Sequence, residues 1–80
     1  FNPSTSFHYN LPKSGMIELT ITDIIGREVI TLVKGYQRSG NHNILWTGND
    51  NMGNKVPSGI YFYNLKSESS IVTKKMTLSK

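Results

Sequence analysis

Apolar and polar residues alternate along most of this sequence, and turn-forming residues interrupt the alternation about every eight to twelve positions. Because successive side chains of a β-strand point to opposite faces, this pattern predicts half-buried strands at 5–11 and 16–22. Pro12 and Gly15 occupy turn positions between them, so we expect these two strands to form a hairpin. The pattern as a whole is typical of an all-β fold, a small antiparallel sandwich or barrel.

The segment 23–36 also carries apolar residues near helical spacing, but Gly26 and several β-branched residues argue against a helix. We interpret 23–27 as a turn and 28–33 as a short strand that is apolar on both sides and therefore covered on both. The remaining strands are expected at 41–47, 60–66 and 71–79, with a loop at 35–40 and a polar turn at 67–70.

Two aromatic residues are expected to anchor the core. Trp46 is the single tryptophan, and its large apolar area suits a central core position. Tyr61 lies on the face of the strand 60–66 that we expect to point inward, because the opposite face ends in polar residues. Pro57 cannot donate to a sheet ladder and should precede that strand, while Gly59 lets the backbone enter it from a tight turn. An aromatic ladder can also stack sugars or bases, but we favour a core strand.

The spacing Asp-x-x-Gly-x-x-Val occurs twice, opening at Asp23 and at Asp50. An aspartate that opens a type I turn can accept backbone N–H groups with its carboxylate, and a glycine three residues later can adopt positive φ. We therefore expect Asp23 with Gly26, and Asp50 with Gly53, to form matching turns. Two copies indicate recurrent turn chemistry rather than a repeat architecture, which needs three or more units.

The last expected strand contains a conflict. Met76 and Leu78 share a face with Lys74, so a regular strand would point a lysine toward the apolar side. Either a bulge near Thr73 shifts the register, or the strand lies at a sheet edge, where the lysine reaches solvent and discourages pairing with other chains. Both alternatives are structural.

Composition excludes several classes of protein. Eighty residues suffice for one domain with a modest core, and the absence of cysteine removes disulfides, thiolate metal sites and cysteine nucleophiles. The net charge is +4, but the nine Lys and Arg are spread along the chain, so no nucleic-acid surface is expected. No run approaches the roughly 20 apolar residues of a membrane helix, so we expect no stable membrane insertion.

Catalysis and metal binding find little support in the residues. His8 and His42 are the only bases of intermediate pKa, and neither has a nucleophile or carboxylate at triad-like spacing, so we interpret both as structural. EF-hand spacing fails around 48–59, although a looser calcium site through Asp50 and Asn51 stays open. The prediction is a protein without enzymatic activity, cofactor or metal.

Five segments, in order and over essentially the whole chain, resemble one family: "FNPSTSFHYNLPKSG", "LTITDIIGREVITLV", "GNHNILWTG", "DNMGNKVPSGIYFYNL" and "KKMTLSK". They are similar to the C-terminal sorting domain of type IX secretion and to the Ig-like domain of the flagellar hook-capping protein. The resemblance implies an immunoglobulin-like antiparallel β-sandwich of about seven strands. It also implies that residues 1–80 are a single C-terminal module excised from a longer secreted protein.

Carried over by position, the family motifs fall on Asn2 and Pro3, on Gly26 and Arg27, on Gly59 and Tyr61, and on the basic end at Lys74, Lys75 and Lys80. The resemblance implies that the terminal strand carries the sorting signal, with Lys74, Lys75, Met76, Leu78 and Lys80 as the residues that are recognised. Thr47 stands where related sequences often have Asp, which weakens any metal role for that loop.

The sorting version of this module implies a specific partner and destination. The type IX outer-membrane machinery of a Gram-negative bacterium would read the module, as a monomer, and export the cargo domain that precedes it in cis. The parent protein would pass through the periplasm and outer membrane to the cell surface or the medium. The alternative is a structural or adhesive Ig-like accessory module: a spacer, a carbohydrate-contacting domain or a part of the hook cap.

Overall fold

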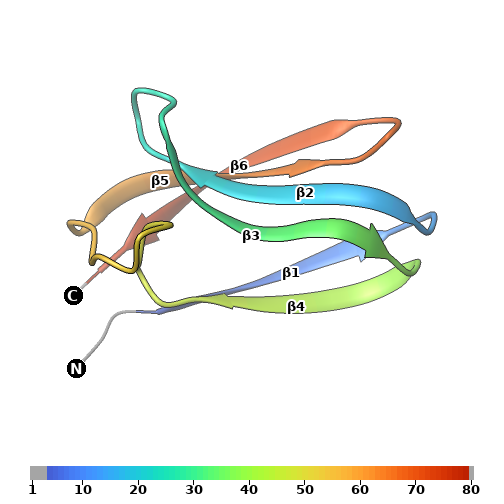
Figure 1. The fold of residues 1–80 in the computed structure, drawn as a ribbon, viewed down its shortest axis with the longest axis horizontal. Helices are drawn as coiled ribbons and strands as arrows, with labels where there is room; N and C mark the ends of the chain where they lie inside the picture. The colour runs from blue at the N-terminus through green and yellow to red at the C-terminus, as the bar shows by residue number, and fades with distance from the viewer. Residues whose placement is uncertain (1–3, 80) are drawn as a thin grey trace.

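The computed structural model describes residues 4–79, which contain six β-strands and no helix (Figure 1). The strands are β1 (Thr5–Leu11), β2 (Gly15–Thr22), β3 (Glu28–Gln37), β4 (Gly40–Trp46), β5 (Gly59–Lys66) and β6 (Ile71–Leu78). Within this part of the chain, no helical segment has the length and apolar character needed to cross a bilayer. All the expected strands are present, and their bounds are close to those that the alternation predicts except at the end of β3, which continues beyond the expected 28–33 to Gln37.

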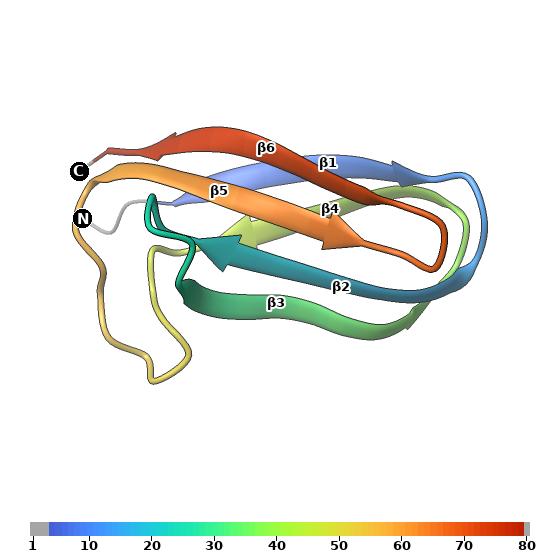
Figure 2. The ribbon, with the colours of Figure 1, turned by 90° about the horizontal axis from the view of Figure 1, so that it is seen from above.

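The strands form two antiparallel sheets that pack face to face (Figures 1 and 2). One sheet contains β1 and β4, and the other has the strand order β3-β2-β5-β6. Between β4 and β5 the chain forms an isolated bridge, Asn49 with Lys55. The immunoglobulin-like sandwich is confirmed, with six strands in the described residues where the resemblance implied about seven.

The predicted hairpin between the first two strands is wrong. β1 pairs with β4, whereas β2 pairs with β3 and β5, so the turn at 12–14 carries the chain from one sheet to the other. Each of the two strands has one apolar face, and such faces can be buried side by side in one sheet or against each other from opposite sheets, which alternation alone does not distinguish. In the sandwich, Phe7 and Leu11 of β1 instead face the buried side chains of β2 across the core.

The predicted loop at 35–40 is also wrong over most of its length. β3 continues to Gln37, and Tyr36 and Gly35 pair with Met16 and Ile17 of β2. The glycine and polar residues of this segment have low strand propensity, but pairing along the full length of β2 overrides it. Only Arg38 and Ser39 separate β3 from β4.

The core lies between the two sheets and is built from the predicted inward faces. Its buried hydrophobic residues are Phe7, Leu11, Ile17, Leu19, Ile21, Trp46, Tyr61, Leu65 and Leu78. They form two clusters, one around Trp46 and one around Leu19, and Leu32 of β3 packs against both. The residues of β3 from Val29 to Val33 are all half-buried. The prediction that this strand is covered on both sides is therefore met only in part.

Candidate functional site

Strand β6 carries most of the residues predicted to be recognised, and these residues differ in exposure to solvent. Lys74 and Lys75 are exposed, whereas Met76 packs against the Trp46 cluster and Leu78 is only 1% exposed. Lys80 lies outside the described residues, as do Asn2 and Pro3 of the opening motif. A partner that contacts the folded module therefore meets the two lysines, while Leu78 serves the core.

The conflict at Lys74 resolves in favour of the edge strand. The register of β5 with β6 runs without a shift from Gly59 opposite Leu78 to Lys66 opposite Ile71, so no bulge occurs near Thr73. β6 lies at the end of its sheet, with β5 on one side only. The Lys74 side chain has the inward parity but reaches solvent at this edge.

The two Asp-x-x-Gly-x-x-Val segments form the matching turns that their spacing predicts. Asp23 Oδ1 accepts the backbone N–H groups of Ile25 and Arg27, each at 2.9 Å. Asp50 Oδ1 accepts those of Met52 and Asn54 at the same distance. In both turns the glycine three residues after the aspartate has a positive φ, 89° at Gly26 and 85° at Gly53, which L-residues rarely adopt.

The second turn docks on the edge of β3 through Asn51, a residue whose role the sequence did not reveal. The Asn51 backbone N–H donates to the Val29 carbonyl at 3.0 Å, and its side-chain Oδ1 accepts the Thr31 N–H at 3.1 Å. Its Nδ2 donates to the Glu28 carboxylate at 3.0 Å. Because these partners lie 20 or more positions away in the chain, no local pattern could have indicated them. Asn51 thus satisfies part of the open edge of β3.

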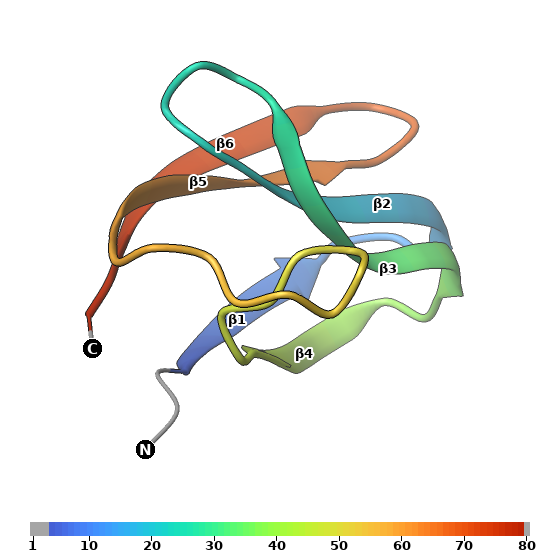
Figure 3. The ribbon, with the colours of Figure 1, turned by 60° about the vertical axis from the view of Figure 1, so that its left-hand side comes forward.

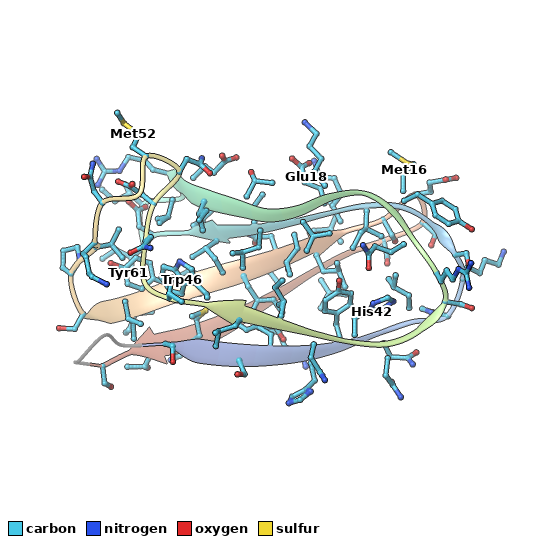
Figure 4. All side chains as sticks on the ribbon, turned by 60° about the horizontal axis from the view of Figure 1, so that its bottom comes forward. Met16, Glu18, His42, Trp46, Met52 and Tyr61 are labelled. Atoms are coloured by element: carbon cyan, nitrogen blue, oxygen red, sulfur yellow. The ribbon has the colours of Figure 1, made fainter. Side chains whose placement is uncertain are left out.

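Tyr61 and Trp46 form the corner that joins the second turn to the core. The Tyr61 hydroxyl donates to the Pro57 carbonyl at 2.6 Å, four residues upstream, at the start of β5. Trp46 packs edge-on against the Tyr61 ring at 5.3 Å, and its indole N–H donates to the Asn49 carbonyl at 2.8 Å. Figure 4 shows both rings between the sheets at one end of the sandwich. A tyrosine bonded to upstream backbone at a strand start is a hallmark of immunoglobulin-like folds.

An apolar groove opens between the 23–27 turn and the segment 56–61. Ile24 and Ile25, at the tip of the turn, are 71% and 72% exposed, and Ile60 on the groove wall is also exposed. Figure 3 shows this turn projecting from the top of the molecule, beside the four-stranded sheet. The groove lacks the enclosed shape and convergent polar groups of a small-molecule site.

Both histidines make contacts within the fold. His42 Nε2 donates to the Arg38 carbonyl at 2.7 Å, its ring stacks on Tyr9 at 5.2 Å, and the His8 ring contacts the Asn43 side chain. The described residues contain no group of three His, Cys, Asp or Glu side chains able to hold a metal ion. In the loose calcium candidate, Oδ1 of Asp50 and Oδ1 of Asn51 accept backbone N–H groups.

The Asp23 carboxylate differs from Asp50 because Arg27 lies beside it, with Nε 2.9 Å from Oδ2. Partial desolvation raises the pKa of Asp23, but the hydrogen bonds from Arg27 and Ile25 and the Arg27 charge outweigh it and lower the pKa below 3.8. The folded state therefore favours the charged form. The resulting stabilisation is present above pH 3.8 and is lost as the pH falls through the lowered pKa.

Asp23→Asn is expected to lower the free energy of unfolding at pH 7 and to leave it nearly unchanged in strong acid, where wild-type Asp23 is also uncharged. Urea unfolding at the two pH values measures the difference. Asp50→Asn is the matched control, because Asn54 stands where the first turn has Arg27, and its loss at pH 7 should be smaller. An equal loss for Asp23→Asn at both pH values would contradict a role for the charge.

The fold is an antiparallel sandwich in which Trp46 and Tyr61 are buried and the Tyr61 hydroxyl bonds to the upstream Pro57 carbonyl. These features together define an immunoglobulin-like module. The family model described as the FlgD Ig-like domain matches residues 3–70. The chain therefore belongs to the FlgD Ig-like domain family. The match ends just before β6 begins at Ile71.

Two solved FlgD structures are similar to this one. FlgD from P. aeruginosa shares 28% sequence identity with a TM-score of 0.71, covering 94% of this chain and 56% of that chain. FlgD from Xanthomonas campestris, whose structure addresses the hook capping essential for flagellar assembly, shares 22% identity with a TM-score of 0.67, so that likeness concerns the fold alone. This second match covers 96% of this chain and 56% of the X. campestris protein. No curated protein matches the chain.

Proposed function

We propose that this chain is a non-catalytic, structural Ig-like module of the flagellar hook-cap type, which acts as part of a larger protein in an assembly. The observation that carries the proposal is the family match over residues 3–70, supported by the 28% identity to P. aeruginosa FlgD across 94% of the chain. The chain spans 56% of that protein's length. A role of the whole protein is therefore a proposal for this module, which resembles only one part of it.

A domain exchange tests the hook-cap role. We expect the chain, placed in the X. campestris FlgD in exchange for the part it matches, to restore hook assembly in part to cells lacking their own FlgD. Hooks counted by electron microscopy give the readout. An unrelated Ig-like sandwich of the same length is the matched control. If the chimera assembles no more hooks than that control, the module lacks the surface that a hook-cap role requires.

A second candidate is the type IX sorting signal, with export of a cargo domain to the cell surface or medium. The observation that favours it is the edge position of β6 in its sheet, which presents Lys74 and Lys75 to solvent. The comparisons match the hook-cap family, so this role stays a prediction that rests on the resemblance of the sequence. In this second role the module acts as a monomer, and its parent protein reaches the outer membrane through the periplasm.

A secretion assay tests the second candidate. Deleting 74–80 would remove Leu78 from the core and confuse recognition with unfolding, so the lysines themselves are changed. A folded reporter fused to the chain is expected in the medium of a type IX host, and to stay periplasmic with Lys74→Glu and Lys75→Glu. Lys13→Glu with Lys55→Glu, two exposed lysines away from β6, is the control. Secretion that is the same for both double variants would reject recognition through β6.

A further inference from the structure

We propose that the open edge of β6 binds an extended, acidic segment of a partner protein, which adds to the four-stranded sheet as a further strand. The inference rests on the proposed function, a module that acts through other proteins, and deepens it by naming the mode of binding and the chemistry of the partner. Figure 2 shows β6 along one long side of the sandwich, with β5 on its inner side.

The backbone of β6 is free to receive a strand. Alternate residues of an edge strand point their N–H and C=O groups away from their only neighbour. Within residues 4–79, the backbone hydrogen bonds of β6 go to β5 alone, and the one side-chain hydrogen bond of β6, from Thr73 to Asn64 of β5, leaves its backbone free. The register with β5 is regular over all eight residues, so the free groups form an uninterrupted row.

The other three edges of the sandwich are less suited to select a partner. Asn51 already occupies the edge of β3 at Val29 and Thr31, and the pairing of β3 with β2 contains two register shifts. β1 and β4 are regular, but neither carries a lysine, arginine, aspartate or glutamate. β6 alone combines a regular open edge with charge.

The charge of this edge specifies the partner. β6 carries Lys74 and Lys75, its neighbour β5 ends in Lys66, and neither strand contains an acidic residue. Glu68 lies in the turn between them, but its carboxylate lies close to Gly15 of β2. Consecutive residues of a strand point to opposite faces, so the two lysines flank the edge from both sides. An added strand complements them when it carries two consecutive acidic residues, one for each face.

The start of β6 adds an apolar requirement. Ile71 and Val72 are 65% and 41% exposed and also point to opposite faces. An antiparallel partner that places its acidic pair opposite Lys74 and Lys75 brings residues two and three positions further along opposite Val72 and Ile71. The edge therefore favours a strand with two acidic residues followed, after one residue, by two apolar ones.

A second copy of this chain does not meet these requirements. In the antiparallel arrangement that pairs all eight residues of two β6 strands, Lys74 of each copy faces Lys75 of the other. Directly opposed like charges destabilise a strand pair, and lysines on an open edge are a common protection against self-association. The lysines thus oppose pairing between copies and favour pairing with an acidic strand.

Peptide titration of the ¹⁵N-labelled 80-residue chain, followed by NMR, tests the inference. The probe is the peptide Thr-Val-Thr-Glu-Glu-Thr-Val-Val, and the matched control replaces Glu-Glu by Lys-Lys. We expect the acidic peptide to shift the amides of 71–78 and to slow their hydrogen exchange, and the basic peptide to do neither. Lys74→Glu with Lys75→Glu should weaken binding of the acidic peptide roughly tenfold and create binding of the basic one.

Backbone pairing is tested separately from charge. Two further acidic peptides carry N-methyl groups on alternate amides, one on the odd and one on the even positions. Strand addition predicts that only one of them binds, because only one set of N–H groups faces β6. The proposal is overturned if both or neither of these peptides bind, if acidic and basic peptides bind alike, or if the shifts lie outside β6. Sedimentation that shows copies of the chain pairing through β6 would also overturn it.

The outcomes separate this inference from the proposed function. A chimera that assembles hooks while the acidic peptide fails to bind would reject strand addition and leave the hook-cap role in place. Peptide binding at β6 together with a chimera no better than the unrelated sandwich would keep the binding edge and reject the hook-cap role.

Discussion

Trp46→Ala is expected to lower the free energy of unfolding by about 3 to 5 kcal/mol. The indole is 1% exposed, packs edge-on against Tyr61 and donates a hydrogen bond to the Asn49 carbonyl. Its removal leaves a cavity between the sheets and an unpaired carbonyl. Because an 80-residue domain has roughly 4 to 12 kcal/mol of stability in total, the variant should be partly unfolded near physiological temperature.

Urea unfolding followed by circular dichroism measures the Trp46 effect, since the variant has lost the single tryptophan. Leu45→Ala is the matched control, since Leu45 is the adjacent residue of β4 and its side chain is exposed on the opposite face. The control should change the stability by no more than about 0.5 kcal/mol. Similar losses in the two variants would mean that Trp46 does not anchor the core.

Leu78→Ala is expected to cost about 2 to 5 kcal/mol, although it lies at the last residue of the last strand. Strand ends usually fray, but Leu78 is 1% exposed and belongs to the cluster of Trp46, Tyr61, Phe7 and Ile21. It therefore fastens an edge strand that otherwise has hydrogen bonds on one side only. Loss of this contact should release β6 from β5 before the rest of the sandwich unfolds.

Hydrogen exchange monitored by NMR measures this release. In Leu78→Ala, the amides of 71–78 should lose more protection than those of β2. Thr77→Ala, which changes an exposed neighbour on the opposite face, is the control and should leave the exchange pattern intact. If both variants lose stability equally, the end of β6 contributes to the fold through its backbone alone.

Features with a local cause could be predicted from the sequence. The period of two identified the inward faces, so β1 has the predicted bounds and Tyr61 and Trp46 are buried. The two aspartate turns follow from the reach of a carboxylate to nearby N–H groups, and both formed as expected. In each case the interacting groups lie within a few positions of one another.

Features that depend on distant pairing could not be predicted in this way. Strand alternation does not say which strand lies beside which, so it predicts a hairpin of β1 and β2, although they belong to different sheets. The extension of β3 through Gly35 depends on its pairing with Ile17, which local propensity does not report. The docking of Asn51 on β3 likewise depends on the topology of the whole sheet, which also decides between the bulge and the edge position that the sequence leaves open for Lys74.

The beginning of β1 and the end of β6 lie at the same end of the sandwich. Thr5 pairs with Trp46, Leu78 pairs with Gly59, and Trp46 contacts Tyr61, two residues further along β5 (Figure 1). Any polypeptide joined to the two ends would therefore enter and leave the module at the same end of the sandwich. The module would then project sideways from its parent protein. Tension along such a parent would act on that end alone. It would peel β6 from β5 one residue pair at a time, while the far end, up to 35 Å away, would carry no load.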